Sequence, residues 1–226
     1  MLDKTLNNIT DRLKLLSEEH LMLQDFNVGD TADIGTESEN GRKLKYPYLH
    51  IDYANTNLRS DFMDMYLGAK CTFCISVGGA GFFGVPFIFR KPNAYVMVPF
   101  GHLCTANKYD LMITKNHIFN KTKKRLNFSE IFSNEVAIIY RQEEFDEKDI
   151  TLEENNPEEI RDLSIEMDDR LNGNWIETDD DLELQNKFWK IFSENIKKQN
   201  LKIPLHGKIK AKFCSNYLRK NKDLLK

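Results

Sequence analysis

The sequence predicts an α/β fold: a Rossmann-like parallel sheet with flanking helices, followed by a helical C-terminal part. Two short apolar runs, residues 71–77 and 94–100, are rich in β-favouring residues and indicate buried parallel strands. A glycine-rich turn follows the first run at 78–84. Segments with helical periodicity alternate with these strands, which is typical of parallel βα units.

Length and composition indicate a globular domain with a well-solvated surface. The chain has 226 residues, of which 41% are hydrophobic and 30% are charged. This length is enough for one sizeable domain. The formal net charge of -3 argues against a nucleic-acid partner, because nucleic-acid-binding domains usually carry a basic surplus. The short basic run at 121–125 is the local exception. We interpret it as a solvated loop, with an anionic partner as the alternative.

The sequence shows no targeting signal, and this absence predicts where in the cell the protein is located. No run reaches the ~20 apolar residues that cross a bilayer. Residues 1–16 contain acidic side chains where a signal peptide has a continuous apolar core. We therefore expect a cytoplasmic protein with no transmembrane segment. Four cysteines are too few for a dense disulfide framework, and a reducing compartment keeps them as thiols.

The first 45 residues differ in character from the rest and define a domain boundary. Apolar residues recur at steps of three and four in residues 2–17, which predicts a helix with one apolar stripe: Leu2, Leu6, Ile9, Leu13 and Leu16. Residues 24–45 are rich in Asp, Gly, Asn, Glu and Ser, which indicates a linker. The sequence therefore predicts an N-terminal helix and linker at 1–45 and one α/β domain at 46–226.

The α/β domain is expected to begin with a strand, a helix and a second strand. Residues 49–54 predict a short strand, and residues 61–70 predict a helix with Ser60 as its N-cap. Four residues are expected to form the buried face of this helix: Phe62, Met63, Tyr66 and Leu67. Three further short elements are expected along the chain: 110–114, 126–132 and a strand at 135–140.

The last third of the chain is predicted to be helical. A first helix begins with an N-cap, a proline and a capping-box glutamate: Asn156, Pro157 and Glu159. Gly173 ends it. Thr178 caps a second helix, whose apolar residues are expected to pack on the body: Leu184, Phe188, Trp189, Ile191, Phe192 and Ile196. A terminal helix is expected at 209–221.

The glycine-rich turn after the first buried strand is the main candidate binding site. In an open parallel sheet, ligands bind outside the carboxyl ends of the strands. Glycines let backbone N–H groups come close to a ligand, and such groups at the start of a helix suit a phosphate or diphosphate. The candidate residues are Ser76, Gly78, Gly79, Ala80 and Gly81. The alternative is a tight turn that serves packing alone.

Residues 79–84, GAGFFG, also match the dinucleotide-binding pattern G-x-G-x-x-G. That fold requires an acidic residue ~20 positions farther on, to bind the ribose. Pro99, Phe100 and Gly101 stand near that place instead. The sequence therefore disfavours a NAD-dependent oxidoreductase.

Several charged residues and one histidine accompany the turn. Arg59, Arg90 and Lys91 are cations that could offset the charge of a diphosphate leaving group. His102 follows the second buried strand and is expected at the same edge of the sheet. Because histidine titrates near neutrality, we assign it a candidate catalytic or phosphate-binding role. Asp64 is expected farther into its helix, where it is harder to explain as a surface charge of the first turn. It is therefore a further candidate binding residue.

Two motifs resemble metal sites, but each has a simpler explanation. Cys71 and Cys74 form a C-x-x-C pair that enters a strand, and a structural zinc would need two further ligands. We expect them to be small buried residues. The acidic run Asp179–Asp181 follows the helix cap Thr178, where carboxylates oppose the helix dipole favourably. We therefore predict no metal site and no cofactor.

One ordered series of motifs is similar to a known family. The stretch HIDYANTNLRSDFMDMYLGAKCTFCISVGGAGFFGVPFIFRKP, followed by VPFGHL, resembles a family of bacterial glycosyltransferases of surface-polysaccharide gene clusters. The later segments NPEEIRDLSIEMDDRLNGNW and LQNKFWKIF look like the C-terminal segments of that family. The resemblance covers roughly residues 45–220. It implies half of a GT-B architecture, in which the C-terminal Rossmann-like domain binds a nucleotide-sugar donor without a metal.

A more distant similarity implies roles for single residues. The stretch RSDFMDMYLGAKCTFCISVGGAG is similar to the donor site of fucosyltransferases. By this similarity Asp64 contacts the base or ribose, and Gly79, Ala80 and Gly81 line the phosphates. Fucosyltransferases commonly carry hydroxyl side chains in that loop, where this chain has glycine and alanine. Backbone donors alone would then hold the diphosphate.

The resemblance also implies partners. The expected ligands are a nucleotide-diphosphate sugar and a glycan or lipid-linked acceptor. Only about 45 residues precede the donor-type domain, which is too few for a second Rossmann unit. We therefore expect residues 1–45 to be a remnant of the acceptor domain. Three alternatives are open: a naturally split subunit, for which a partner chain supplies that domain, a truncated gene product, or a fragment of a longer protein. The alternative is a catalytically silent interaction module that docks a partner chain through the helix at 2–17.

Overall fold

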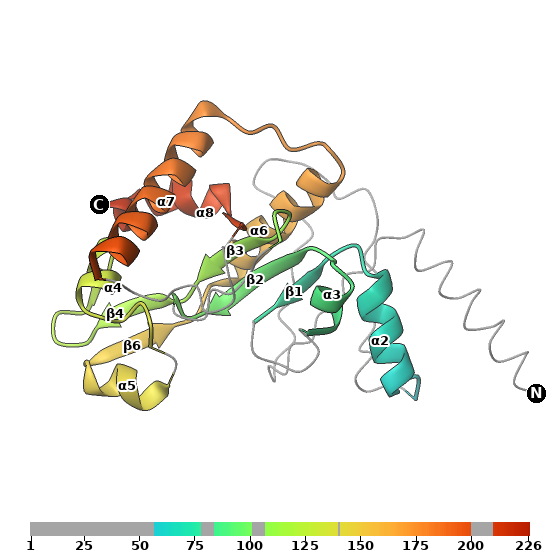
Figure 1. The fold of residues 1–226 in the computed structure, drawn as a ribbon, viewed down its shortest axis with the longest axis horizontal. Helices are drawn as coiled ribbons and strands as arrows, with labels where there is room; N and C mark the ends of the chain where they lie inside the picture. Colours follow the sequence, from blue (N-terminus) through green and yellow to red (C-terminus); the bar gives the residue numbers. More distant parts are fainter. Residues whose placement is uncertain (1–56, 78–83, 101–106, 140, 200–209) are drawn as a thin grey trace, which may run out of the picture.

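The described part of the chain is a mixed α/β structure built around a four-stranded parallel sheet (Figure 1). The computed structural model describes residues 57–77, 84–100, 107–139, 141–199 and 210–226. The sheet has the order β1-β2-β3-β7. Its strands are β1 (Cys74–Ser76), β2 (Asn93–Val98), β3 (Leu111–Thr114) and β7 (Lys212–Phe213). The predicted α/β class with a parallel sheet is confirmed, and the arrangement is compatible with a Rossmann-like fold.

Helices flank this sheet along its length. α2 (Asp61–Lys70) and α3 (Gly84–Ile88) lie beside β1, and α6 (Pro157–Leu171) contacts β2 and β3. The remaining C-terminal elements pack on one another: α4 (Phe128–Ser133), α7 (Asp179–Gln199), α8 (Ser215–Lys220) and the 3-10 helix η4 (Lys222–Leu225). None of the described helices is long and apolar enough to cross a membrane.

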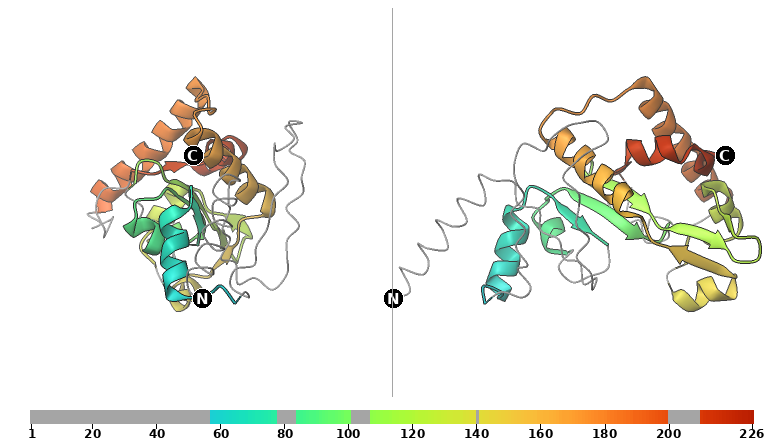
Figure 2. Two further views of the ribbon diagram at one scale, coloured as in Figure 1. Left: turned by 90° about the vertical axis from the view of Figure 1, so that its right-hand side faces the viewer. Right: turned by 180° about the vertical axis from the view of Figure 1, so that it is seen from behind.

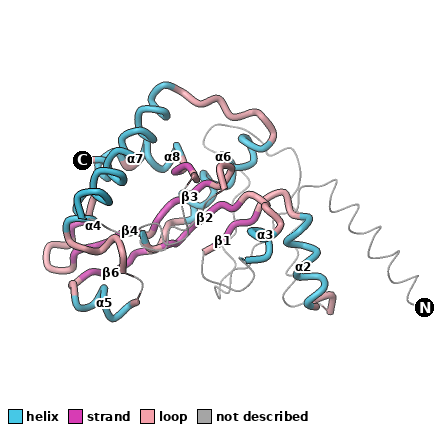
Figure 3. The backbone as a smooth tube through the Cα atoms, viewed as in Figure 1, coloured by secondary structure: helices cyan, strands magenta, loops and turns pink. Residues whose placement is uncertain are grey.

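A second, antiparallel sheet extends the structure beyond the carboxyl end of β3 (Figure 3). It has the order β5-β4-β6, with β4 (Asn116–Phe119), β5 (Lys124–Arg125) and β6 (Ile150–Glu153). Only Lys115 separates β3 from β4, so one extended segment contributes to both sheets. α5 (Gln142–Glu147) packs beside β6, at the opposite end of the described part from α2 (Figure 2). The sequence did not predict this sheet, because its short strands lack a clear alternation.

The predicted caps of the C-terminal helices are confirmed. The Asn156 side chain accepts a hydrogen bond from the Glu159 N–H, and the Glu159 carboxylate accepts one from the Asn156 N–H. Gly173 has a φ of 72°, a left-handed conformation that ends the helix after Leu171. Thr178 Oγ1 accepts a hydrogen bond from the Asp181 N–H at the start of α7.

The predicted strand at 135–140 is wrong for residues 135–139, which form a turn after α4. Glu135 has a φ of 59°, and the Val136 N–H donates back to the Ile131 carbonyl. This reversal folds Val136 and Ile139 into the core without extending the chain. Apolar composition alone could not distinguish a buried turn from a buried strand.

The predicted terminal helix at 209–221 is correct only in its second half. β7 precedes the helix, because the N–H groups of Lys212 and Cys214 donate to the carbonyls of Asp110 and Met112 beside β3. α8 begins at Ser215. The predictions for residues 1–56, including the helix at 2–17, the linker and the strand at 49–54, lie outside the described residues.

α2 has its predicted cap, but only part of its predicted buried face. The Met63 N–H donates to the Ser60 hydroxyl, as expected of an N-cap. Met63 and Leu67 are buried, whereas Phe62 is 69% exposed and Tyr66 is half-buried. The prediction for Phe62 was therefore wrong: α2 carries apolar residues on two faces, and only the face with Met63 and Leu67 is buried.

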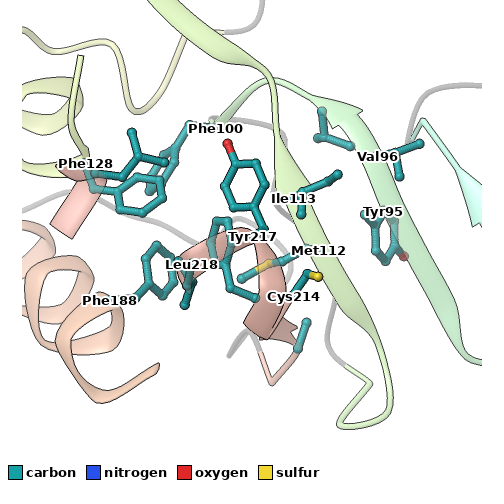
Figure 4. Packing of buried hydrophobic residues seen from close by; sticks show 14 of the residues in the cluster. Tyr95, Val96, Phe100, Met112, Ile113, Phe128, Phe188, Cys214, Tyr217 and Leu218 are labelled. Atoms are coloured by element: carbon teal, nitrogen blue, oxygen red, sulfur yellow. The ribbon is translucent and has the colours of Figure 1, made fainter. Parts of the chain in front are cut away.

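Aromatic side chains from several elements form much of the core (Figure 4). Phe188 of α7 lies 4.3 Å from Phe213 of β7 and 5.0 Å from Phe128 of α4, measured between ring centroids. Phe100, two residues after β2, packs edge-on against Phe132 of α4. This cluster fixes α4 and α7 against the carboxyl end of the sheet.

Candidate functional site

The four parallel strands end at one edge of the sheet, and this edge is the candidate functional site. β1 ends at Ser76, β2 at Val98, β3 at Thr114 and β7 at Phe213. All three pairings between neighbouring strands are parallel, so these ends point the same way. Ligands of open parallel sheets bind outside this edge.

Ser76 lies at the end of the first strand, one residue before the predicted strand end at Val77. It is the last residue of β1, it is buried, and it lies opposite Tyr95 of β2. The described part of the chain resumes at Gly84, which is the first residue of α3. The other candidate residues of the turn, Gly78, Gly79, Ala80 and Gly81, lie outside the described residues, and so does His102.

Two further candidates lie at the amino-terminal end of α2, namely Arg59 and Asp64. α2 runs back alongside β1 (Figure 1). α2 ends at Lys70, shortly before β1 begins at Cys74. Its first turn contains half-buried Asp64, so the expectation that Asp64 lies farther into the helix was wrong. This turn is at the end of the helix away from the start of β1. The Asp64 N–H donates to the Ser60 carbonyl at 2.9 Å, and Arg59 lies just outside the helix on the exposed surface.

Arg90 and Lys91 lie toward the opposite end of the strands. They come directly before β2, whose first residue, Asn93, lies opposite Cys74 at the start of β1. Burial raises the pKa of the Cys71 thiol, and the positive charge of nearby Lys91 partly offsets this effect. Arg90 has a φ of 57°, which turns the chain between α3 and β2. The structure therefore does not bring Arg90 beside Ser76, and its predicted diphosphate role gains no support from this placement.

Asn155 joins the ends of β2 and β3, and the sequence did not single it out. Its Oδ1 accepts a hydrogen bond from the Met97 N–H at 2.8 Å, and its Nδ2 donates to the Thr114 carbonyl at 2.9 Å. Met97 has a φ of 52°, and the register between β2 and β3 shifts at this point. The buried amide thus satisfies backbone groups that the irregular ladder leaves without strand partners.

A second polar group lies where β3 and β7 end. Arg125 of β5 donates from Nη2 to the Tyr217 hydroxyl at 3.0 Å and from Nη1 to Asn221 Oδ1 at 2.6 Å. The Tyr217 hydroxyl in turn donates to the Thr114 carbonyl, and burial raises the pKa of Tyr217 to about 12. The space between these residues has no room for a water-sized molecule. The group therefore joins α8 and η4 to the sheet edge and leaves no space for a ligand.

A fully buried carboxylate lies beyond β7. Glu166 of α6 accepts hydrogen bonds from the N–H and the hydroxyl of Ser215, at 2.7 and 3.0 Å, and pairs with Arg170. Burial, followed by the charge of Glu166, raises the pKa of the Cys214 thiol well above its usual value. Arg170 also pairs with Glu177. The carboxylate satisfies the first N–H group of α8, which indicates a structural role.

The two metal-like motifs have structural explanations in the described residues. Cys71 and Cys74 are buried thiols, and the Cys71 thiol donates to the Gly68 carbonyl. In the acidic run, Asp181 is buried and its carboxylate binds Thr178 and Arg219. Among the described residues, no group of three or more His, Cys, Asp or Glu side chains could hold a metal ion.

Comparison of the chain with protein-family models, with curated proteins and with solved structures found no match. The class that the structure defines is therefore an α/β domain with a parallel sheet, and its carboxyl edge carries the candidate site.

Proposed function

We propose that this chain binds a nucleotide-diphosphate sugar at the carboxyl edge of its parallel sheet, as the donor-binding half of a GT-B glycosyltransferase. One observation carries the proposal. A buried parallel strand, β1, ends at Ser76, the small residues Gly78–Gly81 follow after Val77, and a helix begins at Gly84. In parallel sheets, such a strand–turn–helix unit presents backbone N–H groups to phosphates.

The proposed chemistry is the transfer of a sugar to a hydroxyl group of a glycan or lipid-linked acceptor. The acceptor oxygen forms a bond to the anomeric carbon, the bond from that carbon to the diphosphate oxygen breaks, and a base takes the hydroxyl proton. His102 is the candidate base, and backbone N–H groups of Gly78–Gly81 with Arg59 would stabilise the charge on the leaving diphosphate. Asp64 would accept hydrogen bonds from the nucleobase or the ribose of the donor. A partner chain would supply the acceptor domain.

Titration calorimetry with UDP, GDP and dTDP, each with and without EDTA, tests this function. We expect binding at millimolar concentration or tighter for one nucleotide, unchanged by EDTA. Asp64→Asn should weaken it about tenfold, the loss of roughly one charged hydrogen bond. Asp61→Asn is the matched control, because Asp61 is an exposed carboxylate in the same helical turn.

A second pair of variants tests the turn itself. Gly79→Val should abolish binding, because a branched side chain would stand between the backbone donors and the phosphates. Gly84→Ala should leave binding intact, since a Cβ atom at Gly84 meets nothing within 4 Å. If none of the nucleotides binds the wild-type chain, the proposal is wrong.

A further inference from the structure

Asn172 and Gly173, at the end of α6, form a chemically labile pair on the surface. An asparagine followed by glycine is prone to lose its side-chain nitrogen, because glycine has no side chain to hinder attack by its own backbone nitrogen. Both residues are exposed, and a Cβ atom placed on Gly173 would meet nothing within 4 Å. Water therefore reaches the Asn172 amide freely.

The backbone at Asn172 nevertheless blocks this reaction in the folded chain. Attack requires the Asn172 Cβ atom to eclipse the Gly173 nitrogen about the Cα–C bond. At the observed ψ of 0°, the Gly173 nitrogen eclipses the Asn172 nitrogen instead. The Cα–C bond must therefore rotate by about a third of a turn. This rotation would break the hydrogen bond that the Gly173 N–H donates to the Arg170 carbonyl at 3.3 Å.

Residues 172–178, which connect α6 to α7, would have to move with this rotation, and we call them the α6–α7 link (Figure 1). The N–H groups of Asn174 and Trp175 donate to the Asp169 carbonyl at 2.8 and 3.1 Å. These bonds hold the link against the last turn of α6. The reactive rotation at Asn172 therefore needs a local opening of the link.

Trp175 fastens the link to two helices. The guanidinium groups of Arg170 in α6 and Arg219 in α8 lie over its indole ring, 4.9 and 5.7 Å from the ring centroid. Farther along the link, Glu177 accepts hydrogen bonds from Arg170 and from Lys212 of β7. Contacts with α6, α8 and β7 thus keep the link closed.

We propose that Asn172 is a deamidation site, and that opening of the α6–α7 link sets the rate of the reaction. In the open link, the Gly173 nitrogen forms a bond to Asn172 Cγ and the bond from Cγ to Nδ2 breaks. Nδ2 leaves as ammonia, with the proton that the Gly173 nitrogen gives up. Water then opens the cyclic imide at either carbonyl group, which leaves aspartate or isoaspartate. The reaction consumes only water and is independent of nucleotide binding.

Deamidation would weaken the end of α6. The new carboxylate would stand at the carboxyl end of the helix, where the partial charge of the backbone is also negative. It would also remove the two hydrogen bonds that Asn172 Nδ2 donates to the carbonyl and the carboxylate of Asp168, both at 3.0 Å. Each modified chain therefore holds its α6–α7 link less firmly.

Peptide mapping by mass spectrometry tests the proposal on the full chain, kept at neutral pH either folded or in guanidinium chloride. We expect Asn172 to deamidate at least about tenfold more slowly in the folded wild-type chain than in the denatured one. Trp175→Ala should speed the reaction of the folded chain about tenfold, because two cation–π contacts of the link are lost. Ile176→Ala is the matched control: Ile176 is 82% exposed in the same link, and its loss should leave the rate unchanged.

Asn155→Asp distinguishes opening of the link from unfolding of the whole chain. It removes a buried hydrogen-bond donor at the other end of α6 and should destabilise the fold without touching the link. We therefore expect the wild-type rate at Asn172 in this variant, and acceleration as large as in Trp175→Ala would overturn the role of the link. Equal rates in the folded and denatured wild-type chain, or an unreactive Asn172 in folded Trp175→Ala, would overturn the proposal as well.

Discussion

Arg219 of α8 binds Asp181 of α7 through two hydrogen bonds, from Nε to Oδ1 at 2.7 Å and from Nη2 to Oδ2 at 2.6 Å. Asp181 is fully buried, and its Oδ2 also accepts hydrogen bonds from the N–H and the hydroxyl of Thr178. The carboxylate thus caps α7 and binds α8 at the same time. Burial alone would raise the pKa of Asp181, but these hydrogen bonds outweigh it and lower the pKa.

Replacing Asp181 by Asn should destabilise the fold by about 2–3 kcal/mol, because Arg219 would lose its counter-charge in a partly buried place. Urea unfolding at neutral pH measures this change. Asp179→Asn is the control: Asp179 is exposed in the same turn, and its loss should cost about 0.5 kcal/mol or less. Equal effects of the two substitutions would mean that the pair with Arg219 contributes no stability.

Gly68→Ala should destabilise the protein although alanine is the better helix former. The added Cβ atom would meet Val85 at 2.5 Å and Pro86 at 3.3 Å. Overpacking of this kind costs about 1–3 kcal/mol, against a gain of about 1 kcal/mol in helix propensity. We therefore expect a lower thermal midpoint for Gly68→Ala.

The double variant Gly68→Ala/Val85→Ala should recover part of that loss, because it removes the nearest atoms on α3. Gly84→Ala is the control, since a Cβ atom there has no neighbour within 4 Å, and its stability should match the wild type. A Gly68→Ala chain that is more stable than the wild type would show that α2 and α3 do not touch as described.

Local contacts explain which parts of the fold could be predicted from the sequence. The capping box of α6 was predictable because Asn156 and Glu159 are three positions apart and bond to each other's backbone. The same holds for Ser60 in α2 and Gly173 after α6. Each of these signals depends on a few neighbouring residues and needs no knowledge of the tertiary structure.

Long-range contacts explain what the sequence did not predict. β7 exists because Lys212 and Phe213 pair with a strand a hundred positions earlier. Glu166 was an ordinary polar position in the helical pattern, and its burial depends on Ser215, 49 residues away. The placement of Ser76 at a strand end was predictable. That of Arg90 was not, since it depends on the left-handed turn after α3.

Asn155 should be needed for the junction between β2 and β3. In Asn155→Asp, the carboxylate could still accept from the Met97 N–H, but it would face two acceptors without a proton to donate: the Thr114 carbonyl and the Glu159 carboxylate, to which Nδ2 donates at 2.9 and 3.0 Å. A buried acceptor left without its donor costs about 1–3 kcal/mol, and more when the new group is charged. We expect a loss of stability of about 3 kcal/mol in urea unfolding. The exposed Asn174→Asp should change it by about 0.5 kcal/mol or less, and an Asn155→Asp chain as stable as this control would contradict the bridging role.

His117 should make the stability of the protein depend on pH between about 6.5 and 4. The imidazole is 1% exposed, and it lies 6.0 Å from the Phe145 ring. Burial, aided by the positive charge of Arg125, lowers the pKa of His117 from 6.5 to about 4. In this range the unfolded chain binds a proton that the folded chain does not, so stability falls as the pH falls.

The contribution of His117 to the change from pH 7 to pH 5 is about 2 kcal/mol, because a shift of one pKa unit corresponds to about 1.4 kcal/mol. Urea unfolding at both pH values measures it. In His117→Phe, an apolar ring replaces the imidazole while the other titratable groups of the chain are unchanged, so the loss between pH 7 and pH 5 should shrink by that amount. A variant with the same pH dependence as the wild type would mean that folding does not lower the pKa of His117. In that case its burial next to Phe145 would have to be compensated by a carboxylate that the described structure does not place there.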